Sequence, residues 1–351
     1  MKVNVFKIAQ TSPDDLSGLE HLIQTQALEP TTIVAILGKT EGNGCVNDFT
    51  RGFATQTCKH YLTAHIGKDR AEQIIYVMSG GTEGVLSPHL TLFTRQPSPA
   101  DVAPHWGLVL GTSRTKDFLP AEIGTLTMVD AVEKAVRAAI TDAQLTPQDV
   151  HFVQIKCPLI ASSRTGLQDS QQLRTQDSYK SMAYSRGASA LGVAVALGEV
   201  DRHRLKASDI CANYALYSSV ASTSAGIELQ NCEIIVLGNG ATSTSGFVIG
   251  HSVMAHGLDV AAVHQAIAHT QQPLAQIVNV FAKAEADPSG RILGRRHTML
   301  DDSDINHTRM ARAVVGAVVA SVVQDPMVYV SGGAEHQGPA GGGPVAAIAA
   351  L

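Results

Sequence analysis

The sequence predicts an α/β protein made of three structurally similar repeat units around a pseudo-threefold axis, with strands forming a barrel-like core inside and helices outside. Three times, a hydrophobic strand ends in a lysine, and a later strand leads into a turn of small residues that contains serine. Each time, an arginine at the start of a helical segment stands between the lysine and the serine. Because one order of residues recurs three times, a repeat is favoured over a single doubly wound sheet with chance similarities.

The first unit, residues 1–101, is expected to contain a helix, a strand, a second helix, a strand, a small-residue turn and a final strand. Apolar residues in the helical segments recur at three- and four-residue spacing, which is typical of amphipathic helices. The expected elements are the helix 14–26, the strand 33–39, the helix 53–66, the strand 76–78 and the strand 89–93. The segment Gln96–Asp101 contains two prolines and predicts a linker.

The second unit, residues 109–246, and the third unit, residues 252–351, follow the same order. In the second unit we expect the helix 128–144, the strand 152–156, the helix 188–197, the strand and turn 219–224 and the strand 233–237. In the third we expect the helix 258–269, the strand 277–283, the helix 313–323, the strand and turn 329–333 and the strand 345–349. The second unit is the longest, and its polar stretch Ser162–Lys180 predicts a loop that is a candidate lid.

The repeated residues suit nucleophilic catalysis. A serine hydroxyl is a weak nucleophile until a base removes its proton, and a neutral lysine amine can be that base. A free lysine has a pKa of about 10.4, and burial and nearby positive charge both lower it. The arginines would supply that positive charge and stabilise an oxyanion. The candidate residues are the lysines Lys39, Lys156 and Lys283 and the arginines Arg51, Arg186 and Arg312.

The small-residue turns differ in one unit. The first and third turns read Ser-Gly-Gly, beginning at Ser79 and Ser331, whereas the middle one reads Ser222-Thr223-Ser224. Glycine lets a backbone approach a ligand closely, as an oxyanion hole requires. Only one dyad can attack a bound ring, so the odd unit is favoured, with Ser222 as the nucleophile, although spacing alone does not decide this. A threefold pocket of this kind suits a flat cyclic imide or ureide.

Composition narrows the class of protein further. The chain has 351 residues, 44% hydrophobic and 16% charged, which predicts two or three packed units and favours an oligomer. A net charge of -5 without a basic block gives no reason to expect nucleic acid or a membrane as partner. Five cysteines without a Cys-x-x-Cys pair predict free thiols in a reducing compartment. With no signal-like or membrane-spanning apolar stretch, a soluble cytoplasmic protein is expected.

Three other kinds of site are disfavoured. Gly238-Asn239-Gly240 imitates the opening of a dinucleotide-binding loop, but Ser243 stands where the third glycine belongs, so no organic cofactor is expected. Fourteen histidines include no His-Glu-x-x-His pattern for zinc. Cys157 adjoins Lys156, and neighbouring strand residues point to opposite faces, so Cys157 should not face the pocket.

Four segments in order resemble the ring-opening amidohydrolases, the family that comprises cyanuric acid amidohydrolase and barbiturase. The similarity is greatest to the cyanuric acid branch and extends along the whole chain. The segments are Leu37-Gly38-Lys39-Thr40-Glu41-Gly42-Asn43-Gly44, Val77-Met78-Ser79-Gly80-Gly81-Thr82-Glu83-Gly84, Ala221-Ser222-Thr223-Ser224-Ala225-Gly226 and Ser331-Gly332-Gly333-Ala334-Glu335-His336-Gln337-Gly338-Pro339.

The resemblance implies roles for individual residues. Lys156 would be the base and Ser222 the nucleophile, while Lys39 and Lys283 would position the ring and tune its charge. Substrate would also be bound by Arg51, Ser79, Gly80, Arg186, Ser222, Thr223, Arg312, Ser331 and Gly332. A structural Mg²⁺ would be held by Glu285 and by main-chain oxygens of Ala334, Gln337, Gly338, Pro339 and Gly342.

The resemblance also implies a reaction and an assembly. The protein would open the s-triazine ring of cyanuric acid by cleaving an amide C–N bond, giving carboxybiuret that decarboxylates to biuret. Barbituric acid is the alternative substrate, and a non-catalytic protein that binds cyclic imides is the alternative class. The family further suggests a homotetramer.

Overall fold

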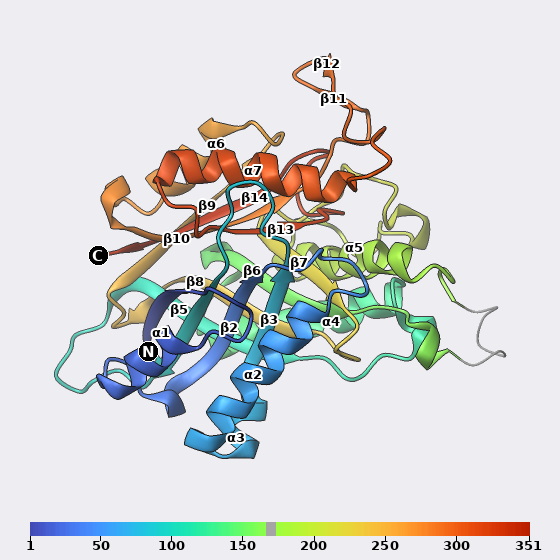
Figure 1. Cartoon of the computed structure of the whole chain (residues 1–351). Helices are drawn as coiled ribbons and strands as arrows, with labels where there is room; N and C mark the ends of the chain where they lie inside the picture. The colour runs from blue at the N-terminus through green and yellow to red at the C-terminus, as the bar shows by residue number, and fades with distance from the viewer. Residues whose placement is uncertain (166–172) are drawn as a thin grey trace.

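Three four-stranded sheets of identical topology form the framework of the protein. The computed structural model describes residues 1–165 and 173–351 (Figure 1). The first sheet contains β1 (Lys2–Ala9), β2 (Ile33–Thr40), β3 (Ile75–Gly80) and β4 (His89–Gln96). The second contains β5 (His105–Arg114), β6 (Val150–Pro158), β7 (Ala221–Gly226) and β8 (Glu233–Ser243). The third contains β9 (Phe247–Met254), β10 (Ile277–Ala284), β13 (Tyr329–Gly332) and β14 (Gly343–Ala350).

The strand order is the same in each sheet. It is β1-β4-β2-β3 in the first, β5-β8-β6-β7 in the second and β9-β14-β10-β13 in the third. In each case the strand that ends near the lysine is parallel to the strand that ends near the serine turn, and it is antiparallel to its other neighbour. This shared topology confirms the α/β class and the threefold recurrence expected from the lysines and serines.

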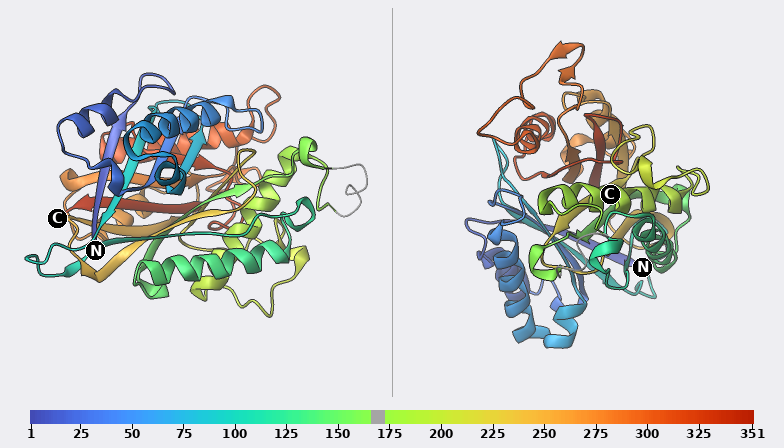
Figure 2. Two further views of the ribbon diagram at one scale, coloured as in Figure 1. Left: turned by 90° about the horizontal axis from the view of Figure 1, so that it is seen from below. Right: turned by 90° about the vertical axis from the view of Figure 1, so that its right-hand side faces the viewer.

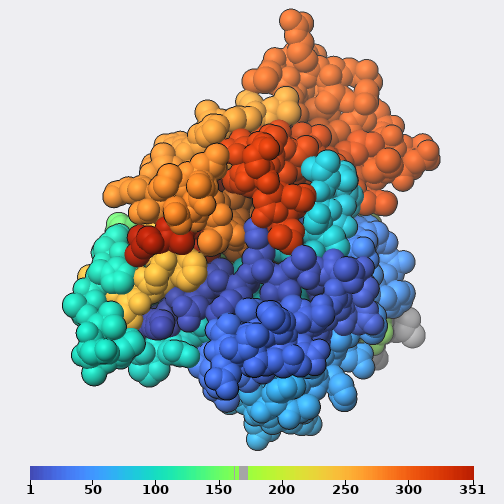
Figure 3. Space-filling model, turned by 60° about the vertical axis from the view of Figure 1, so that its left-hand side comes forward, coloured from blue at the N-terminus to red at the C-terminus, as the bar shows by residue number. Residues whose placement is uncertain are grey.

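The helices lie on the outside of the sheets (Figure 2). The first unit contributes α1 (Ser17–Gln24), α2 (Phe49–Ile66) and α3 (Lys68–Gln73), and the second contributes α4 (Leu126–Asp142) and α5 (Ser178–Leu197). The third contributes α6 (Val260–Ala268) and α7 (His307–Val323). Short 3₁₀ turns at Pro30–Thr32, Pro147–Asp149 and Leu274–Gln276 precede β2, β6 and β10, which is a further element of the repeat. A small hairpin, β11 (Arg291–Ile292) and β12 (Arg295–Arg296), projects from the third unit (Figure 3).

The inner faces of the three sheets meet in one apolar core. Phe281 of β10 lies at its centre, with its ring centroid 5.1 Å from that of Phe152, 6.3 Å from that of Phe93 and 5.7 Å from that of Tyr329. These four side chains are fully buried and come from all three sheets. Each outer face instead packs against the helices of its own unit, in three further apolar clusters. The strands therefore lie inside and the helices outside, as predicted.

Each unit begins with a strand that the sequence analysis does not predict. These strands, β1, β5 and β9, occupy one edge of each sheet. Glycines interrupt the apolar pattern of two of them because helices lie very close: a Cβ at Gly111 would lie 2.0 Å from the main-chain oxygen of Ala139, and one at Gly250 would lie 2.4 Å from that of Ala266. As a result, the predicted unit starts at residues 109 and 252 fall inside β5 and β9.

The helices that carry the candidate arginines begin earlier than predicted. Arg51 lies in the first turn of α2, but Arg186 and Arg312 lie well inside α5 and α7. The start of α5 at Ser178 falls within the polar stretch predicted as a loop. Part of that stretch, residues 166–172, lies outside the described residues. Among the helices that the structure describes, none combines the length and apolar character required to cross a bilayer.

Candidate active site

The pairing of parallel strands sets which serine stands opposite each lysine. In all three units the lysine strand and the serine strand run side by side in the same direction, so their carboxyl ends meet at one edge. The paired residues are Lys39 with Ser79, Lys156 with Ser224, and Lys283 with Ser331. The serine of the second unit that is equivalent to Ser79 and Ser331 is therefore Ser224.

The prediction that Ser222 stands beside Lys156 is wrong. Ser222 is paired with Gln154, and its hydroxyl donates a hydrogen bond to Oε1 of Gln154 at 2.9 Å. Ser222 and Ser224 share a face of β7 because strand residues two apart point the same way, but Ser222 lies further from the strand end. Ser224, and not Ser222, is among the described residues that line the adjacent cavity.

A longer motif in the sequence identifies the same serine. Each turn reads Ser, then a small residue, then Gly, then any residue, then Glu: Ser79 to Glu83, Ser224 to Glu228, and Ser331 to Glu335. Aligning the turns on this glutamate selects Ser224. The glutamates are functional residues that the sequence analysis misses, although their fixed spacing from the serine could have revealed them.

A cavity lies where the carboxyl ends of β3, β7 and β13 meet α5 and α7. Ser224 and Ala225 contribute to it from the second unit, in the places that the prediction gave to Ser222 and Thr223. The structure brings together at its walls most of the residues predicted to bind substrate, namely Arg51, Ser79, Gly80, Lys156, Arg186, Arg312, Ser331 and Gly332.

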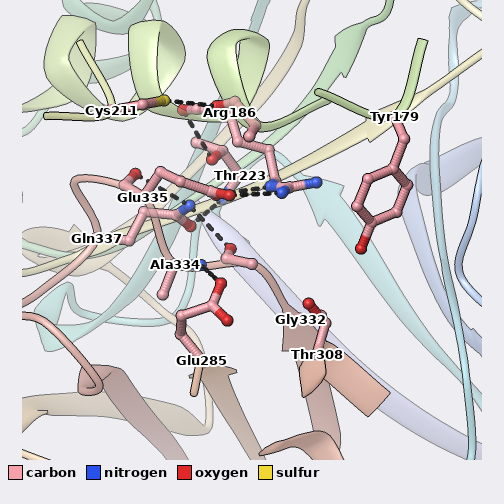
Figure 4. A network of polar contacts seen from close by, with 12 residues as sticks. Tyr179, Arg186, Cys211, Thr223, Glu285, Thr308, Gly332, Ala334, Glu335 and Gln337 are labelled. Atoms are coloured by element: carbon pink, nitrogen blue, oxygen red, sulfur yellow. Dashed lines mark hydrogen bonds and ion pairs between the residues drawn. The ribbon is translucent and has the colours of Figure 1, made fainter. Parts of the chain in front are cut away.

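Thr223 faces away from this cavity. Its hydroxyl donates a hydrogen bond to the main-chain oxygen of Arg186 at 3.1 Å, and its main-chain N–H donates to Oε1 of Gln337 at 2.7 Å (Figure 4). Thr223 therefore joins β7 to α5 and to the loop after β13. Thr223 is not among the described residues that line the cavity, because its side chain lies on the opposite face of β7 from Ser224.

The three turns leave unequal space beside their serines. A Cβ at Gly80 would lie 1.8 Å from a carboxylate oxygen of Asp48, and one at Gly332 would lie 2.3 Å from Cγ2 of Thr308. The second unit carries Ala225 at this position and tolerates its methyl group. The second turn is therefore the one with a side chain beside its serine, which makes the pocket asymmetric.

The lysine amines reach main-chain carbonyls at the serine turns. Nζ of Lys156 donates to the oxygen of Met78 at 2.9 Å, and Nζ of Lys283 donates to the oxygen of Thr223 at 2.8 Å. Each of these hydrogen bonds joins one unit to the residue that precedes the serine of another unit. Lys39 donates to the oxygen of Gly80 at 3.3 Å. Lys39 and Lys283 are thus buried behind the serine turns rather than among the residues that line the cavity.

Burial lowers the pKa of all three lysines from the ordinary lysine value. For Lys39, burial is followed by repulsion from Arg312, which lowers its pKa further. For Lys283, burial and then repulsion from Arg186 lower the pKa to about 7. For Lys156, burial also lowers the pKa, but attraction to Glu228 opposes that effect. The expectation that burial and positive neighbours would depress these amines is therefore confirmed.

Two glutamates of the repeated motif hold arginines of neighbouring units. Arg186 donates from Nε and Nη2 to the two carboxylate oxygens of Glu335, at 2.8 and 2.6 Å (Figure 4). Arg312 makes the same two-pronged contact with Glu83, and its Nε lies 2.8 Å from Oε2. Burial raises the pKa of Glu335, but the attraction and hydrogen bonds of Arg186, with smaller contributions, together lower it below its ordinary value. These ion pairs fix two arginines at the wall of the cavity.

Arg186→Met is expected to lower the free energy of unfolding by about 3–5 kcal/mol, because it leaves the Glu335 carboxylate buried without a counter-charge. Chemical denaturation followed by circular dichroism measures the loss. The matched control is the double variant Arg186→Met/Glu335→Met, which removes both charges and should recover most of the stability. A double variant as unstable as the single one would show that the buried charge is not the cause.

The second unit departs from this pattern. Glu228 pairs with Lys156, with Nζ 2.9 Å from Oε1, and not with an arginine. Arg51, which occupies the position of the missing partner, donates instead to the main-chain oxygen of Cys45 at 2.8 Å. Burial raises the pKa of Glu228, but attraction to Lys156 and Arg51, together with hydrogen bonds, lowers it to about 2.

The cavity has further lining residues, from loops, β3, α5 and α7, that are not predicted from the sequence. Tyr179, at the start of α5, donates a hydrogen bond to Oδ1 of Asn306, which caps α7, at 3.2 Å. This contact links the second and third units beside the cavity. The other missed lining residues are Asn43, Gly44, Cys45, Met78, Met182, Thr308 and Arg309. These positions have no repeated pattern, so the sequence carries no signal for them.

The predicted magnesium ligands are adjacent and chemically suitable. Glu285, at the end of β10, accepts a hydrogen bond from the main-chain N–H of Ala334 at 3.3 Å (Figure 4). Ala334, Gln337, Gly338, Pro339 and Gly342 lie in the loop between β13 and β14, and its carbonyls with one carboxylate form an oxygen set suited to a hard cation. No cluster of three or more His, Cys, Asp or Glu side chains suited to a metal occurs in residues 1–165 and 173–351. The magnesium site remains a prediction.

Comparisons with known proteins agree with this geometry. Residues 4–350 match the family described as amidohydrolase ring-opening protein. The chain is 52% identical to a cyanuric acid amidohydrolase of Enterobacter cloacae and 50% identical to that of Pseudomonas sp. (strain ADP), with 99% of each chain covered in both cases.

Solved structures extend the similarity to the fold. A cyanuric acid hydrolase structure superposes with a TM-score of 0.95 at 49% identity, covering 100% of this chain and 99% of the other. The enzyme from A. caulinodans gives a TM-score of 0.93 at 48% identity, with 99% of each chain covered. The matches in sequence and in structure both span the three units and the cavity between them, and the chain therefore belongs to the amidohydrolase ring-opening family.

Proposed function

We propose that this protein hydrolyses cyanuric acid, opening its s-triazine ring to carboxybiuret, which decarboxylates to biuret. The observation that carries the proposal is the cavity bounded by serine turns from three units, which offers a flat, trigonal ring similar polar contacts on three sides. The names of relatives about half identical over their full length support the same substrate.

Ser224 is the proposed nucleophile and Lys156 the proposed base. The Ser224 hydroxyl oxygen is buried and has no hydrogen-bond partner among the described residues, so no protein contact has to be broken before it attacks. In contrast, the Ser331 hydroxyl accepts a hydrogen bond from Nζ of Lys283 at 3.1 Å. Ser224 is also paired across the strands with Lys156, whose pKa burial depresses.

The reaction then follows ordinary acyl transfer. Ser224 Oγ bonds to a ring carbonyl carbon while the neutral Lys156 amine takes the hydroxyl proton. Lys156 returns that proton to the ring nitrogen as the C–N bond breaks. Water attacks the acyl-serine, releases carboxybiuret and restores the hydroxyl. Arg51, Arg186 and Arg312 hold positive charge near the carbonyl oxygens, where negative charge develops.

Two structural features accompany the proposed activity. A Mg²⁺ held by Glu285 and by main-chain oxygens of Ala334, Gln337, Gly338, Pro339 and Gly342 would fix the loop that carries Glu335. A homotetramer in the cytoplasm, without an organic cofactor, is the proposed working form.

A side-by-side assay tests the substrate. Purified protein is incubated with cyanuric acid or with barbituric acid, which has a CH₂ in place of one ring N–H, and loss of ultraviolet absorbance and formation of biuret are followed. A higher kcat/KM for cyanuric acid is expected. A preference for barbituric acid would reassign the substrate, and binding of either ring without turnover would make the protein a binder and not an enzyme.

A further inference from the structure

Three equivalent glutamates have two kinds of partner. Glu83 and Glu335 each hold the guanidinium of an arginine from a neighbouring unit. By the same arrangement Glu228 should hold Arg51, but it pairs with Lys156 at 2.9 Å. The exception occurs in the unit that carries the proposed nucleophile, so the difference in partner coincides with the difference in chemistry.

Within the described part of the chain, Arg51 has a free N–H at Nε, the atom with which the other two arginines bind their glutamates. In Arg186 and Arg312, Nε and Nη2 donate to the carboxylate. In Arg51, Nε is buried without a hydrogen-bond partner among the described residues, and Nη2 is turned to the oxygen of Cys45. An unpaired buried guanidinium N–H costs free energy, so Arg51 favours an acceptor that approaches Nε.

Glu228 is paired with Lys156 and is also attracted by the charge of Arg51. Its side chain is 24% exposed, against 20% for Glu83 and 12% for Glu335, so water has access to the pair with Lys156. A Cβ at Gly226 would lie 2.2 Å from Oε2 of Glu228, so a glycine is needed in this turn for the carboxylate to lie where it does.

The present pairing favours the protonated form of Lys156. A carboxylate at hydrogen-bonding distance favours the ammonium, and an ammonium cannot accept the proton of Ser224. The charged or titratable groups that act on Lys156 are the Glu228 carboxylate, the Arg51 guanidinium and, from the opposite face of β6, the thiol of Cys157. Without the carboxylate, burial and the charge of Arg51 both favour the neutral amine.

We propose that Glu228 moves from Lys156 to Arg51 when a cyclic substrate fills the cavity, and that this exchange of partners converts Lys156 into the base. The inference rests on the proposed hydrolysis. On exchange, Lys156 releases one proton to water and becomes a neutral amine. It then accepts the Ser224 proton as the Oγ–C bond forms and delivers that proton to the ring nitrogen as the C–N bond breaks. Glu228 is thus a positioning residue that acts through Lys156.

The pH dependence of kcat/KM tests this role, since its acid limb reports the pKa of the free enzyme's base. Glu228→Gln removes the carboxylate that retains the lysine proton, so the acid limb should move to lower pH by about 1–3 units. The matched control is Glu83→Gln, which releases Arg312 and leaves the Lys156–Glu228 pair intact. Whatever its effect on the rate, the control should keep the acid limb of the wild type.

A crystal structure of the Ser224→Ala variant soaked with cyanuric acid tests the movement directly. Glu228 is expected to hold Nε and Nη2 of Arg51, as Glu335 holds Arg186. A filled cavity with Glu228 still on Lys156, or an unchanged acid limb in Glu228→Gln, would overturn the inference. If the wild type fails to open cyanuric acid at all, it is the proposed function that fails, so the two failures are distinct.

Discussion

Ser224→Ala is expected to lower kcat for cyanuric acid by about 10³-fold or more, because removing a nucleophile leaves only binding and charge stabilisation. Ser224 is paired with Lys156, lines the cavity and has a buried hydroxyl without a partner among the described residues. Initial rates at saturating substrate measure the effect, and circular dichroism checks that the variant folds.

Ser222→Ala is the matched control on the same strand. It removes the hydrogen bond to Gln154 and leaves the cavity wall unchanged, so we expect a small loss of stability, about 0.5–1.5 kcal/mol, and nearly full activity. If Ser222→Ala were the inactive variant and Ser224→Ala the active one, the strand register would not identify the nucleophile.

Lys156→Met is expected to reduce kcat/KM by about 10²–10⁴-fold, which is the range for losing a general base. The methionine has nearly the same length but cannot take a proton. The variant also leaves the Glu228 carboxylate without its partner, so some loss of stability is expected, smaller than that of Arg186→Met because the Glu228 side chain is 24% exposed. Steady-state rates and chemical denaturation, measured on one preparation, separate loss of chemistry from loss of fold.

Lys39→Met and Lys283→Met are the controls that show whether the lysine of the second unit has a special role. Each removes an equally buried amine that pairs with a serine across the strands, but in a unit whose glutamate holds an arginine. Smaller losses of kcat are expected from both. Equal losses in all three variants would mean that the units share the chemistry, and the second would then have no special role.

The repeat could be predicted from sequence because its signals are local. A run of apolar residues that ends in Lys39, Lys156 or Lys283 gives the strand and the buried amine together. The Cys157 prediction also holds, since its side chain is buried with Sγ 3.5 Å from the main-chain oxygen of Ser224 and is not among the described lining residues. Alternation along a strand is sufficient for such assignments.

The choice between Ser222 and Ser224 needed information that alternation lacks. Both serines are on one face of β7, so the period of two cannot separate them; pairing with β6 does, and so does the fixed spacing to Glu228. The link from Glu335 to Arg186 was likewise out of reach, because the residues are 149 positions apart and belong to different units. The edge strands β5 and β9 were missed because glycines beneath helices interrupt their apolar runs.

The glutamate–arginine contacts join the third unit to both of the others: Arg312 of the third unit binds Glu83 of the first, and Arg186 of the second unit binds Glu335 of the third. Both chain ends lie at one junction, where the Met1 amine donates to the oxygen of Thr242 at 2.7 Å and the Leu351 N–H donates to the oxygen of Gly246 at 2.9 Å. Because the two termini meet, the arrangement of the three units does not depend on which unit comes first in the chain. Joining the old termini and opening the linker at 97–104 would yield a circular permutant with the same three neighbours around the same cavity.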